Sequence, residues 1–171
     1  MQRVAQFEKV SPSRFIEDWM DTFGGSPSQA QEIYSGLILP RRATAGSAGY
    51  DFFAPAPFTL GPGESIKIPT GIRVRMEQGW VLSCYPRSGL GFRYRLQLNN
   101  TVGIIDSDYY DSDNEGHIFC KLTNDTREGK TLRLAAGEGY MQGIFLPFGI
   151  TQDDEATQKR NGGFGSTNQR G

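Results

Sequence analysis

The sequence has 171 residues, enough for one domain with a buried core, and its 18 basic and 19 acidic residues leave a net charge of −1. This charge disfavours a general surface for nucleic acid, and no segment has the length and apolar composition of a membrane span. The start of the chain, MQRVAQFEKV, lacks the apolar core of a signal peptide, so we expect a soluble, cytoplasmic protein.

The first predicted strand is RVAQFEKV, at residues 3–10. After it, SPSRFIEDWMDTF combines an initial serine, an early proline and apolar residues at helical spacing, and SPSQAQEIYSGL repeats the same start signal. We therefore predict one or two surface helices within residues 10–37, inserted after the first strand. The apolar stripe of Phe15, Trp19 and Phe23 could bind a partner protein, but we favour its packing on the rest of the chain or on a sister subunit.

Short runs of β-forming residues with period-two alternation, separated by glycine and proline turns, fill much of residues 65–148. They are SIKIPTGIRVRM (65–76), WVLSCYP (80–86), HIFCKLTN (117–124), TLRLAA (131–136) and YMQGIFLPF (140–148). Strands this short predict an all-β barrel, sandwich or jelly roll. Cys84 and Cys120 lie within such runs without the spacing of zinc ligands, which predicts buried, reduced thiols. The single histidine, His117, excludes a histidine-rich metal centre and a standard serine triad.

Residues 100–118, NTVGIIDSDYYDSDNEGHI, begin as an apolar strand that we expect to be buried and then become rich in acids. The five carboxylates are Asp106, Asp108, Asp111, Asp113 and Glu115. The last three, with Gly116, imitate the start of an EF-hand loop, but Leu122 stands where a calcium loop requires a bidentate carboxylate, and no flanking helices are predicted. A solvated hairpin tip is the better interpretation of this segment.

Three further motifs suit phosphate or a turn without deciding between them. The segment YPRSGLGF offers the planar guanidinium of Arg87, a serine hydroxyl and an unhindered glycine amide, but it could also be a Pro-Gly turn with a surface arginine. The segment GSAGYDFFAP places Asp51 among aromatics, as in a capped turn that enters a strand. The C-terminal GGFGST lacks the lysine and the following helix of a P-loop, and by composition alone its polar, Gly-rich surroundings are typical of a disordered tail.

The order and spacing of AGYD, PRSGLG, NTVGIIDSDY, GEGYMQGIF and NGGFGST resemble the five motifs of the trimeric dUTP pyrophosphatases, over residues 38–171 plus the first strand. The resemblance implies a single domain, residues 1–171, with a jelly-roll-like β-barrel and a flexible C-terminal arm, residues 157–171. It implies a homotrimer with active sites between subunits, each closed by an arm. The implied reaction is hydrolysis of dUTP to dUMP and pyrophosphate with Mg²⁺, which limits uracil in DNA and supplies dUMP for thymidylate synthesis.

The resemblance also implies roles for individual residues. Asp106 matches the catalytic aspartate that orients the attacking water, and Tyr109 matches the aromatic that packs on the deoxyribose and excludes a 2′-hydroxyl. Asp108 would lie two residues farther along a strand, on the same side as Asp106, with a structural or electrostatic role. Asn100 matches the residue that reads uracil, assisted by the hairpin backbone around Val102 and Gly103.

The remaining matches concern phosphate and metal. Asp51 and Gln142 match positions near the waters of Mg²⁺ and the α-phosphate. The residues matched to phosphate binding are Arg87, Ser88 and Gly89 in the turn and Lys159 or Arg160, Gly165, Ser166 and Thr167 in the arm. Phe164 of the arm would stack on the uracil.

The chain departs from the pattern of the family in three places. Lys159 stands where an arginine is usual in the fifth motif, with Arg160 one residue later, and Gly139 replaces the usual arginine of the fourth motif. The hairpin after Tyr109 is lengthened by YDSDN. We therefore expect Asp106 and Tyr109 to belong to the site and the later acids to lie on an inserted tip. The related dCTP deaminases would require a TLE-type catalytic glutamate, and the sequence contains none.

Overall fold

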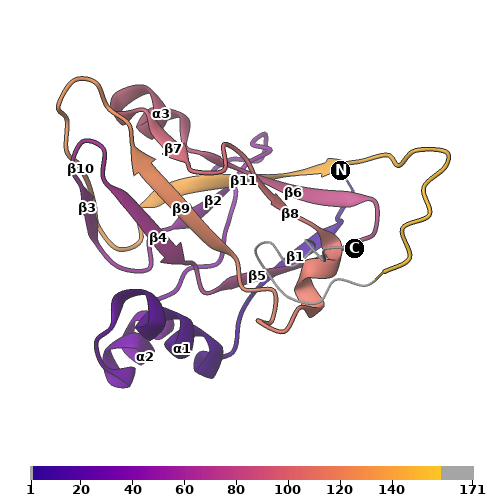
Figure 1. Cartoon of the computed structure of the whole chain (residues 1–171), viewed down its shortest axis with the longest axis horizontal. Coiled ribbons are helices and arrows are strands. Elements are labelled where there is room, and N and C mark those ends of the chain that lie inside the picture. Colours follow the sequence, from indigo (N-terminus) through magenta and orange to yellow (C-terminus); the bar gives the residue numbers. More distant parts are fainter. Residues whose placement is uncertain (1, 159–171) are drawn as a thin grey trace, which may run out of the picture.

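The computed structural model describes residues 2–158, and Figure 1 shows its strands, its α-helices and one 3-10 helix. The strands are β1 (Ala5–Lys9), β2 (Tyr50–Phe53), β3 (Phe58–Leu60), β4 (Ser65–Pro69), β5 (Ile72–Met76), β6 (Trp80–Pro86), β7 (Leu96–Leu98), β8 (Gly103–Ile105), β9 (Phe119–Asn124), β10 (Leu132–Leu134) and β11 (Gly139–Pro147). The helices are α1 (Pro12–Phe23), α2 (Pro27–Ser35), α3 (Ser88–Tyr94) and the 3-10 helix η1 (Ser107–Asp111). No helix among the described residues is long and apolar enough to cross a membrane.

Within residues 2–158 the strands form four antiparallel sheets. The largest has the order β2-β11-β6-β8, the next has the order β4-β9-β7, and β1-β5 and β10-β3 are two-stranded. The prediction of an all-β, jelly-roll-like fold with a helical insertion after the first strand is confirmed. The sheets remain open, however, rather than closing into one continuous barrel.

One main core joins the two larger sheets. Phe52, Leu82 and Tyr140 from the four-stranded sheet and Ile68 and Leu122 from the three-stranded sheet are almost completely buried in it. Each large apolar side chain removed from water in this way contributes about 1.5–3 kcal/mol to folding. Both cysteines are free and buried, as predicted, and burial raises the pKa of each thiol to about 12.

The β-type run at residues 65–76 forms two strands, β4 and β5, in different sheets. The chain turns between β4 and β5 at Gly71, whose φ of +74° favours glycine. A Cβ at this position would collide with the side chain of Leu37 and would lie 3.1 Å from Cδ2 of Phe15. The turn is therefore shaped by contacts with the insertion, which local periodicity does not reveal.

The two predicted helices of the insertion are confirmed as α1 and α2, which Figure 1 shows beside β4. Ser11 caps α1 by accepting a hydrogen bond from the backbone of Arg14 (3.2 Å), and a proline follows each cap. Phe15 is fully buried, and its ring lies 5.4 Å from that of Trp19. The stripe thus packs on the chain itself at Phe15, whereas Phe23, at the end of α1, is 44% exposed.

Candidate active site

Three of the predicted site residues meet at one end of the four-stranded sheet. In the register of β11, Gln142 lies opposite Asp51 of β2 on one side and Tyr85 of β6 on the other. Directly opposite residues share a face of the sheet, so the Asp51 carboxylate and the Gln142 amide lie side by side. A Cβ at Gly49 would be 2.7 Å from Oε1 of Gln142, which explains why the AGYD motif has glycine there.

Arg87 belongs to the same group. Its Nε lies 3.2 Å from Oδ1 of Asp51, and its Nη1 donates a hydrogen bond to the carbonyl oxygen of Gly139 (3.4 Å). The side chain of Asp51 is only 17% exposed and that of Arg87 is 45% exposed, so the pair lies at the edge of the solvent. Although Gly139 stands where an arginine was expected, Asp51 thus has the guanidinium of Arg87 beside it.

The phosphate-binding turn predicted from the sequence continues as a short helix. Arg87 is the N-cap residue of α3, and the exposed Ser88 and Gly89 occupy its first turn. The two glycines of SGLG have low helix propensity, which hid this helix from sequence analysis. A hollow of about 420 Å³ beside the turn is lined by Tyr85, Pro86, Arg87, Ser88, Gly91, Phe92 and Leu96.

A second, mostly apolar cavity of about 340 Å³ lies on the other side of β6 and β8. It is lined by Lys67, Cys84, Leu98, Asn99, Asn100, Gly103, Ile105, Ile118, Phe119, Cys120, Lys121 and Met141. Asn100 brings an amide to this apolar space. A Cβ at Gly103 would lie 3.1 Å from Cβ of Cys84, so glycine permits the close approach of β8 to β6. The half-buried Val102 is not part of the lining.

The acidic segment does not continue the strand, which corrects two expectations. β8 ends at Ile105, Asp106 is the half-buried N-cap residue of η1, and Asp108 is an exposed residue of the first turn of that helix. We expected Asp106 and Asp108 to lie on the same side of a strand, and this expectation is wrong because neither residue belongs to a strand. Ile104, expected to be buried, is 56% exposed.

Tyr109 is held in place by its hydroxyl. The ring is 6% exposed within the single chain, and the hydroxyl donates a hydrogen bond to the carbonyl oxygen of His117 (2.8 Å). The side-chain amide of Asn114 donates in turn to the hydroxyl of Tyr109 (2.7 Å). Both contacts come from the loop that follows η1, so this loop determines where the tyrosine lies.

The predicted solvated tip is wrong for Glu115, although Asp111 and Asp113 are exposed. Glu115 accepts hydrogen bonds from the backbone N–H of Ser11 (2.7 Å) and from its hydroxyl (2.6 Å). Burial raises the pKa of Glu115, but these two hydrogen bonds together with the positive charges of Arg73 and Arg14 outweigh it, and the net pKa is lower than usual. This carboxylate therefore ties the loop to the start of α1.

Sequence analysis missed the part played by His117. The side chain is fully buried, and its Nε2 accepts a hydrogen bond from the N–H of Gly71 (2.8 Å), which places the ring proton on Nδ1. Nδ1 donates to Oδ2 of Asp18 in α1, at 2.6 Å. Burial lowers the pKa of His117, and the hydrogen bond to Asp18 opposes only part of that shift. The partners lie 46 and 99 residues away, so no local signal could have revealed them.

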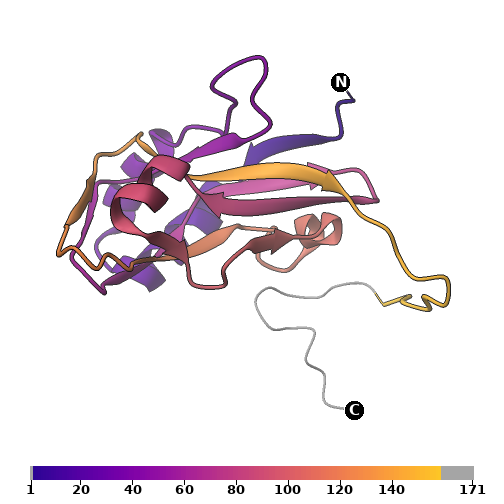
Figure 2. The ribbon, with the colours of Figure 1, turned by 90° about the horizontal axis from the view of Figure 1, so that it is seen from above.

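Arg87 and Asp106 lie at opposite ends of β6. Ile105 pairs with Leu82, so Asp106 lies beyond it at the level of Val81, whereas Arg87 follows the other end of the strand. Six residues of strand span about 20 Å. Figures 1 and 2 show α3 and η1 at opposite ends of the molecule, in agreement with this register. Within one chain, the predicted phosphate-binding turn therefore lies far from Asp106, the predicted catalytic aspartate.

The predicted residues of the arm lie outside the described residues: Lys159, Arg160, Phe164, Gly165, Ser166 and Thr167. Among residues 2–158 no group of three or more His, Cys, Asp or Glu side chains could hold a metal ion. Asp51, the predicted outer ligand, is paired with a guanidinium and lies beside an amide.

Comparison with known proteins gives consistent results. Residues 36–168 match the family model for dUTPase. The deoxyuridine 5′-triphosphate nucleotidohydrolase of Lactococcus lactis subsp. lactis (strain IL1403) is 44% identical over 136 residues, which cover 78% of this chain and 89% of that protein. The corresponding protein of Tolumonas auensis is 38% identical over 137 residues, covering 75% of this chain and 86% of that protein.

Solved structures agree with the sequence comparisons. The crystal structure of the dUTPase from Streptococcus mutans has 34% sequence identity and a TM-score of 0.62, covering 85% of this chain and 98% of that one. The dUTPase from phage phi11 of S. aureus shares the fold, with a TM-score of 0.63 at 18% identity over 91% of this chain and 97% of that one. The match to the family model and the identity to its members show that this chain belongs to the dUTPase family.

Proposed function

We propose that this protein hydrolyses dUTP to dUMP and pyrophosphate in sites that each combine residues of more than one copy of the chain. Besides the family, the observation that carries the proposal is the separation of Asp106 from Arg87 along β6. Attack requires the water and the α-phosphorus to approach within about 3–3.5 Å. A phosphate chain held at Arg87 does not reach a water held by Asp106 of the same chain, which supports a site that takes the two residues from different subunits of the homotrimer implied by the family resemblance.

An exposed apolar sheet face supports this assembly. Ser83 of β6 lies opposite both Ile104 of β8 and Ile144 of β11, so these side chains share one face, and Leu146 follows two residues later on that same face. Ile104 is 56% exposed and Leu146 is 40% exposed. Neighbouring exposed apolar side chains are typical of interaction surfaces, and a sister subunit is the partner that the separated site requires.

The base binds in the apolar cavity beside Asn100. An amide side chain offers both a donor and an acceptor to the edge of uracil, while cytosine reverses that pattern and leaves buried polar groups unpaired, at about 1–3 kcal/mol each. By the family resemblance, the hairpin backbone around Val102 and Gly103 would exclude the methyl group of thymine by crowding. The ring of Tyr109 packs on the deoxyribose and excludes a 2′-hydroxyl.

The reaction is an in-line displacement at the α-phosphorus. The carboxylate of Asp106 accepts a hydrogen bond from a water molecule and directs the oxygen at phosphorus. A bond forms between this oxygen and the α-phosphorus while a proton of the water passes to the carboxylate of Asp106, the bond to the bridging oxygen breaks, and pyrophosphate leaves with the electrons of that bond. The guanidinium of Arg87, the hydroxyl of Ser88 and the amide of Gly89 hold the phosphate chain.

Magnesium fits the residues present. Asp51 and Gln142 supply two oxygen donors side by side, and Mg²⁺ prefers oxygen and retains several of its waters, so these residues would hold the waters of an ion that also binds the triphosphate. When bound, the ion neutralises part of the charge of the triphosphate. The dUTPase of phage phi11 is described as coordinating a structural Mg(II) ion.

The C-terminal arm completes the proposed site. By the family resemblance, Phe164 would stack on the uracil, and Gly165, Ser166 and Thr167, with Lys159 or Arg160, would contact the β- and γ-phosphates. Closing the arm would exclude water and strengthen the charge contacts. In the cytoplasm this activity would limit the incorporation of uracil into DNA and would supply dUMP for thymidylate synthesis.

A substrate panel tests the proposal. Pyrophosphate release is measured with Mg²⁺ and dUTP, UTP, dCTP or dTTP, and we expect efficient cleavage of dUTP alone and no ammonia from dCTP. Asp106→Asn should lower kcat by about 10²–10⁴-fold while a non-hydrolysable dUTP analogue still binds. No pyrophosphate from dUTP, or an undiminished kcat in the variant, would contradict the proposed reaction.

A further inference from the structure

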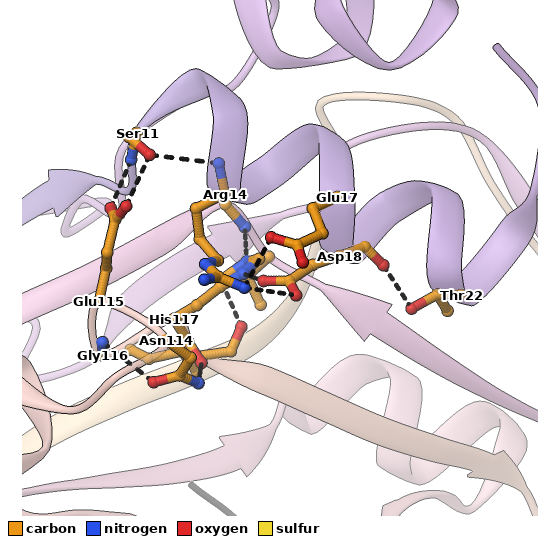
Figure 3. A network of polar contacts seen from close by, with 12 residues as sticks. Ser11, Arg14, Glu17, Asp18, Thr22, Asn114, Glu115, Gly116 and His117 are labelled. Carbon is orange, nitrogen blue, oxygen red and sulfur yellow. Dashed lines mark hydrogen bonds and ion pairs between the residues drawn. The ribbon is translucent and has the colours of Figure 1, made fainter. Parts of the chain in front are cut away.

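The helical insertion and the lengthened loop, the two segments that the resemblance does not explain, contact each other. Figure 3 shows Glu115 reaching the start of α1 and His117 reaching Asp18, farther along the same helix. Both contacts join residues about a hundred positions apart in sequence. Neither segment belongs to the family pattern, and each supplies hydrogen-bond partners for the other.

The first contact is made by a backbone in an unfavourable conformation. Glu115 has a φ of +59°, a region that costs most side chains about 1–2 kcal/mol. Its carboxylate accepts both the N–H and the hydroxyl of Ser11, while the same hydroxyl accepts a hydrogen bond from the backbone of Arg14. The strained residue is therefore fixed by a charge-assisted pair of hydrogen bonds at the cap of α1.

The second contact is buried. His117 is completely inaccessible, and it bridges the carboxylate of Asp18 and the backbone N–H of Gly71. Arg14 lies 3.6 Å from the other oxygen of Asp18, so this carboxylate is oriented from two sides. A buried hydrogen-bonded histidine resists displacement because losing either partner would leave a polar atom without water.

These contacts lead directly to Tyr109. The carbonyl oxygen of His117 accepts its hydroxyl proton, and Asn114 donates to its hydroxyl oxygen. Between these two residues, a Cβ at Gly116 would lie 2.7 Å from the carbonyl oxygen of Tyr109, so the loop doubles back tightly against η1. An unbroken path of hydrogen bonds and three loop residues connects α1 to the hydroxyl of Tyr109.

We propose that α1 is a brace for the sugar-binding tyrosine: Ser11 and Asp18 hold Glu115 and His117, and these hold Tyr109 against the deoxyribose. The inference rests on the proposed function, in which the ring of Tyr109 excludes a 2′-hydroxyl. Ser11, Asp18, Glu115 and His117 are then positioning residues for substrate discrimination. Through this brace the insertion would influence substrate discrimination without itself contacting the substrate.

The test compares Glu115→Ala with Glu115→Gln, whose amide oxygen can still accept from the N–H of Ser11 while its amide nitrogen donates to the hydroxyl oxygen of Ser11. Asp111→Ala is the matched control, because it removes an exposed carboxylate from the last residue of η1, directly before the loop. The readout is the ratio of kcat/KM for dUTP to kcat/KM for UTP. We expect Glu115→Ala to lower this ratio about tenfold, which corresponds to about 1.4 kcal/mol, and the other two variants to stay within about twofold of the original protein.

A second pair of variants gives the same comparison from the helix. Asp18→Ala should lower the ratio, Asp18→Asn should restore most of it by accepting from Nδ1 of His117, and Asp21→Ala is the control on the exposed side of α1. An unchanged ratio in the alanine variants, whatever their melting temperature, would overturn the brace alone. An original protein that cleaves UTP as readily as dUTP would overturn the proposed role of Tyr109, and the brace with it.

Discussion

The guanidinium of Arg87 lies across Gly139. A Cβ at position 139 would be 2.7 Å from Nη1 and 3.2 Å from Cδ of Arg87, so the position occupied by the guanidinium depends on the missing side chain. The same guanidinium contacts Asp51 and forms one wall of the hollow at the phosphate turn. This relationship explains how the chain accommodates glycine where its relatives are expected to have arginine.

Gly139→Ala should therefore move Arg87 without unfolding the protein. The atoms in conflict belong to the end of a flexible side chain, so we expect little change in the melting temperature and a several-fold increase in KM for dUTP. Gly46→Ala is the control, because a Cβ there meets no atom within 4 Å among the described residues. Identical KM values for the two variants would show that Gly139 does not position Arg87.

Mixed trimers should recover activity that neither variant has alone. Asp106→Asn and Arg87→Ala damage opposite ends of the chain, and a shared site needs Asp106 from one subunit and Arg87 from another. Subunits exchanged at random in equal amounts should form intact sites with about a quarter of the original activity, by the symmetry of such an assembly. Pyrophosphate release measured before and after exchange checks this, and no recovery after verified exchange would mean that each chain builds its own site.

Stability should fall as the pH drops below about 6.5. In the unfolded chain His117 takes up a proton near its ordinary value of 6.5, whereas in the folded protein its pKa is lower. The unfolded state then binds more protons than the folded state. The contribution of His117 to the free energy of unfolding is therefore fully present above pH 6.5 and is lost as the pH falls through the folded pKa. The charged groups that face the imidazole are Asp18 and Arg14 of α1 and Glu115 of the loop.

Denaturant unfolding of the original protein and of His117→Gln, between pH 7.5 and 5.5, measures the contribution of His117 to the free energy of unfolding. Glutamine can accept from Gly71 but does not titrate, so the stability difference between the two proteins should narrow as the pH falls. A stability difference that stays constant over this pH range would exclude His117 as the source of the pH dependence. Glu115 also stabilises the folded state more at higher pH, but at lower pH values than His117. Its folded pKa lies below the ordinary value of 4.5, so its contribution to stability is lost as the pH falls below 4.5.

Gly71→Ala should be strongly destabilising. The new Cβ collides with Leu37 in a packed site, and the residue has a positive φ, so we expect a loss of about 2–4 kcal/mol. Gly63→Ala is the matched control, because Gly63 has a φ of +77° but a Cβ there meets nothing within 4 Å among the described residues. Urea unfolding at one protein concentration checks the difference, and equal losses would show that the contact with Leu37 is unimportant.

Much of the fold follows from local patterns. The Ser-Pro starts of α1 and α2 were readable because capping and helix propensity act within one turn, and the alternation of strands such as β6 and β9 acts over a few residues. Where local signals were weak or absent, prediction failed. Two glycines hid α3, and Pro69 and Gly71, the local marks of the division of residues 65–76 into β4 and β5, stand inside one β-type run.

The sequence by itself determined the family, the order of the motifs, the helices of the insertion and the burial of both cysteines, since these depend on residue type and short spacing. Tertiary structure alone decided that Glu115 and His117 contact α1 and its cap, that Arg87 occupies the space beside Gly139, and that Arg87 and Asp106 lie at opposite ends of β6. These relationships join residues tens of positions apart in sequence, and their partners are chosen by the packing of sheets and helices.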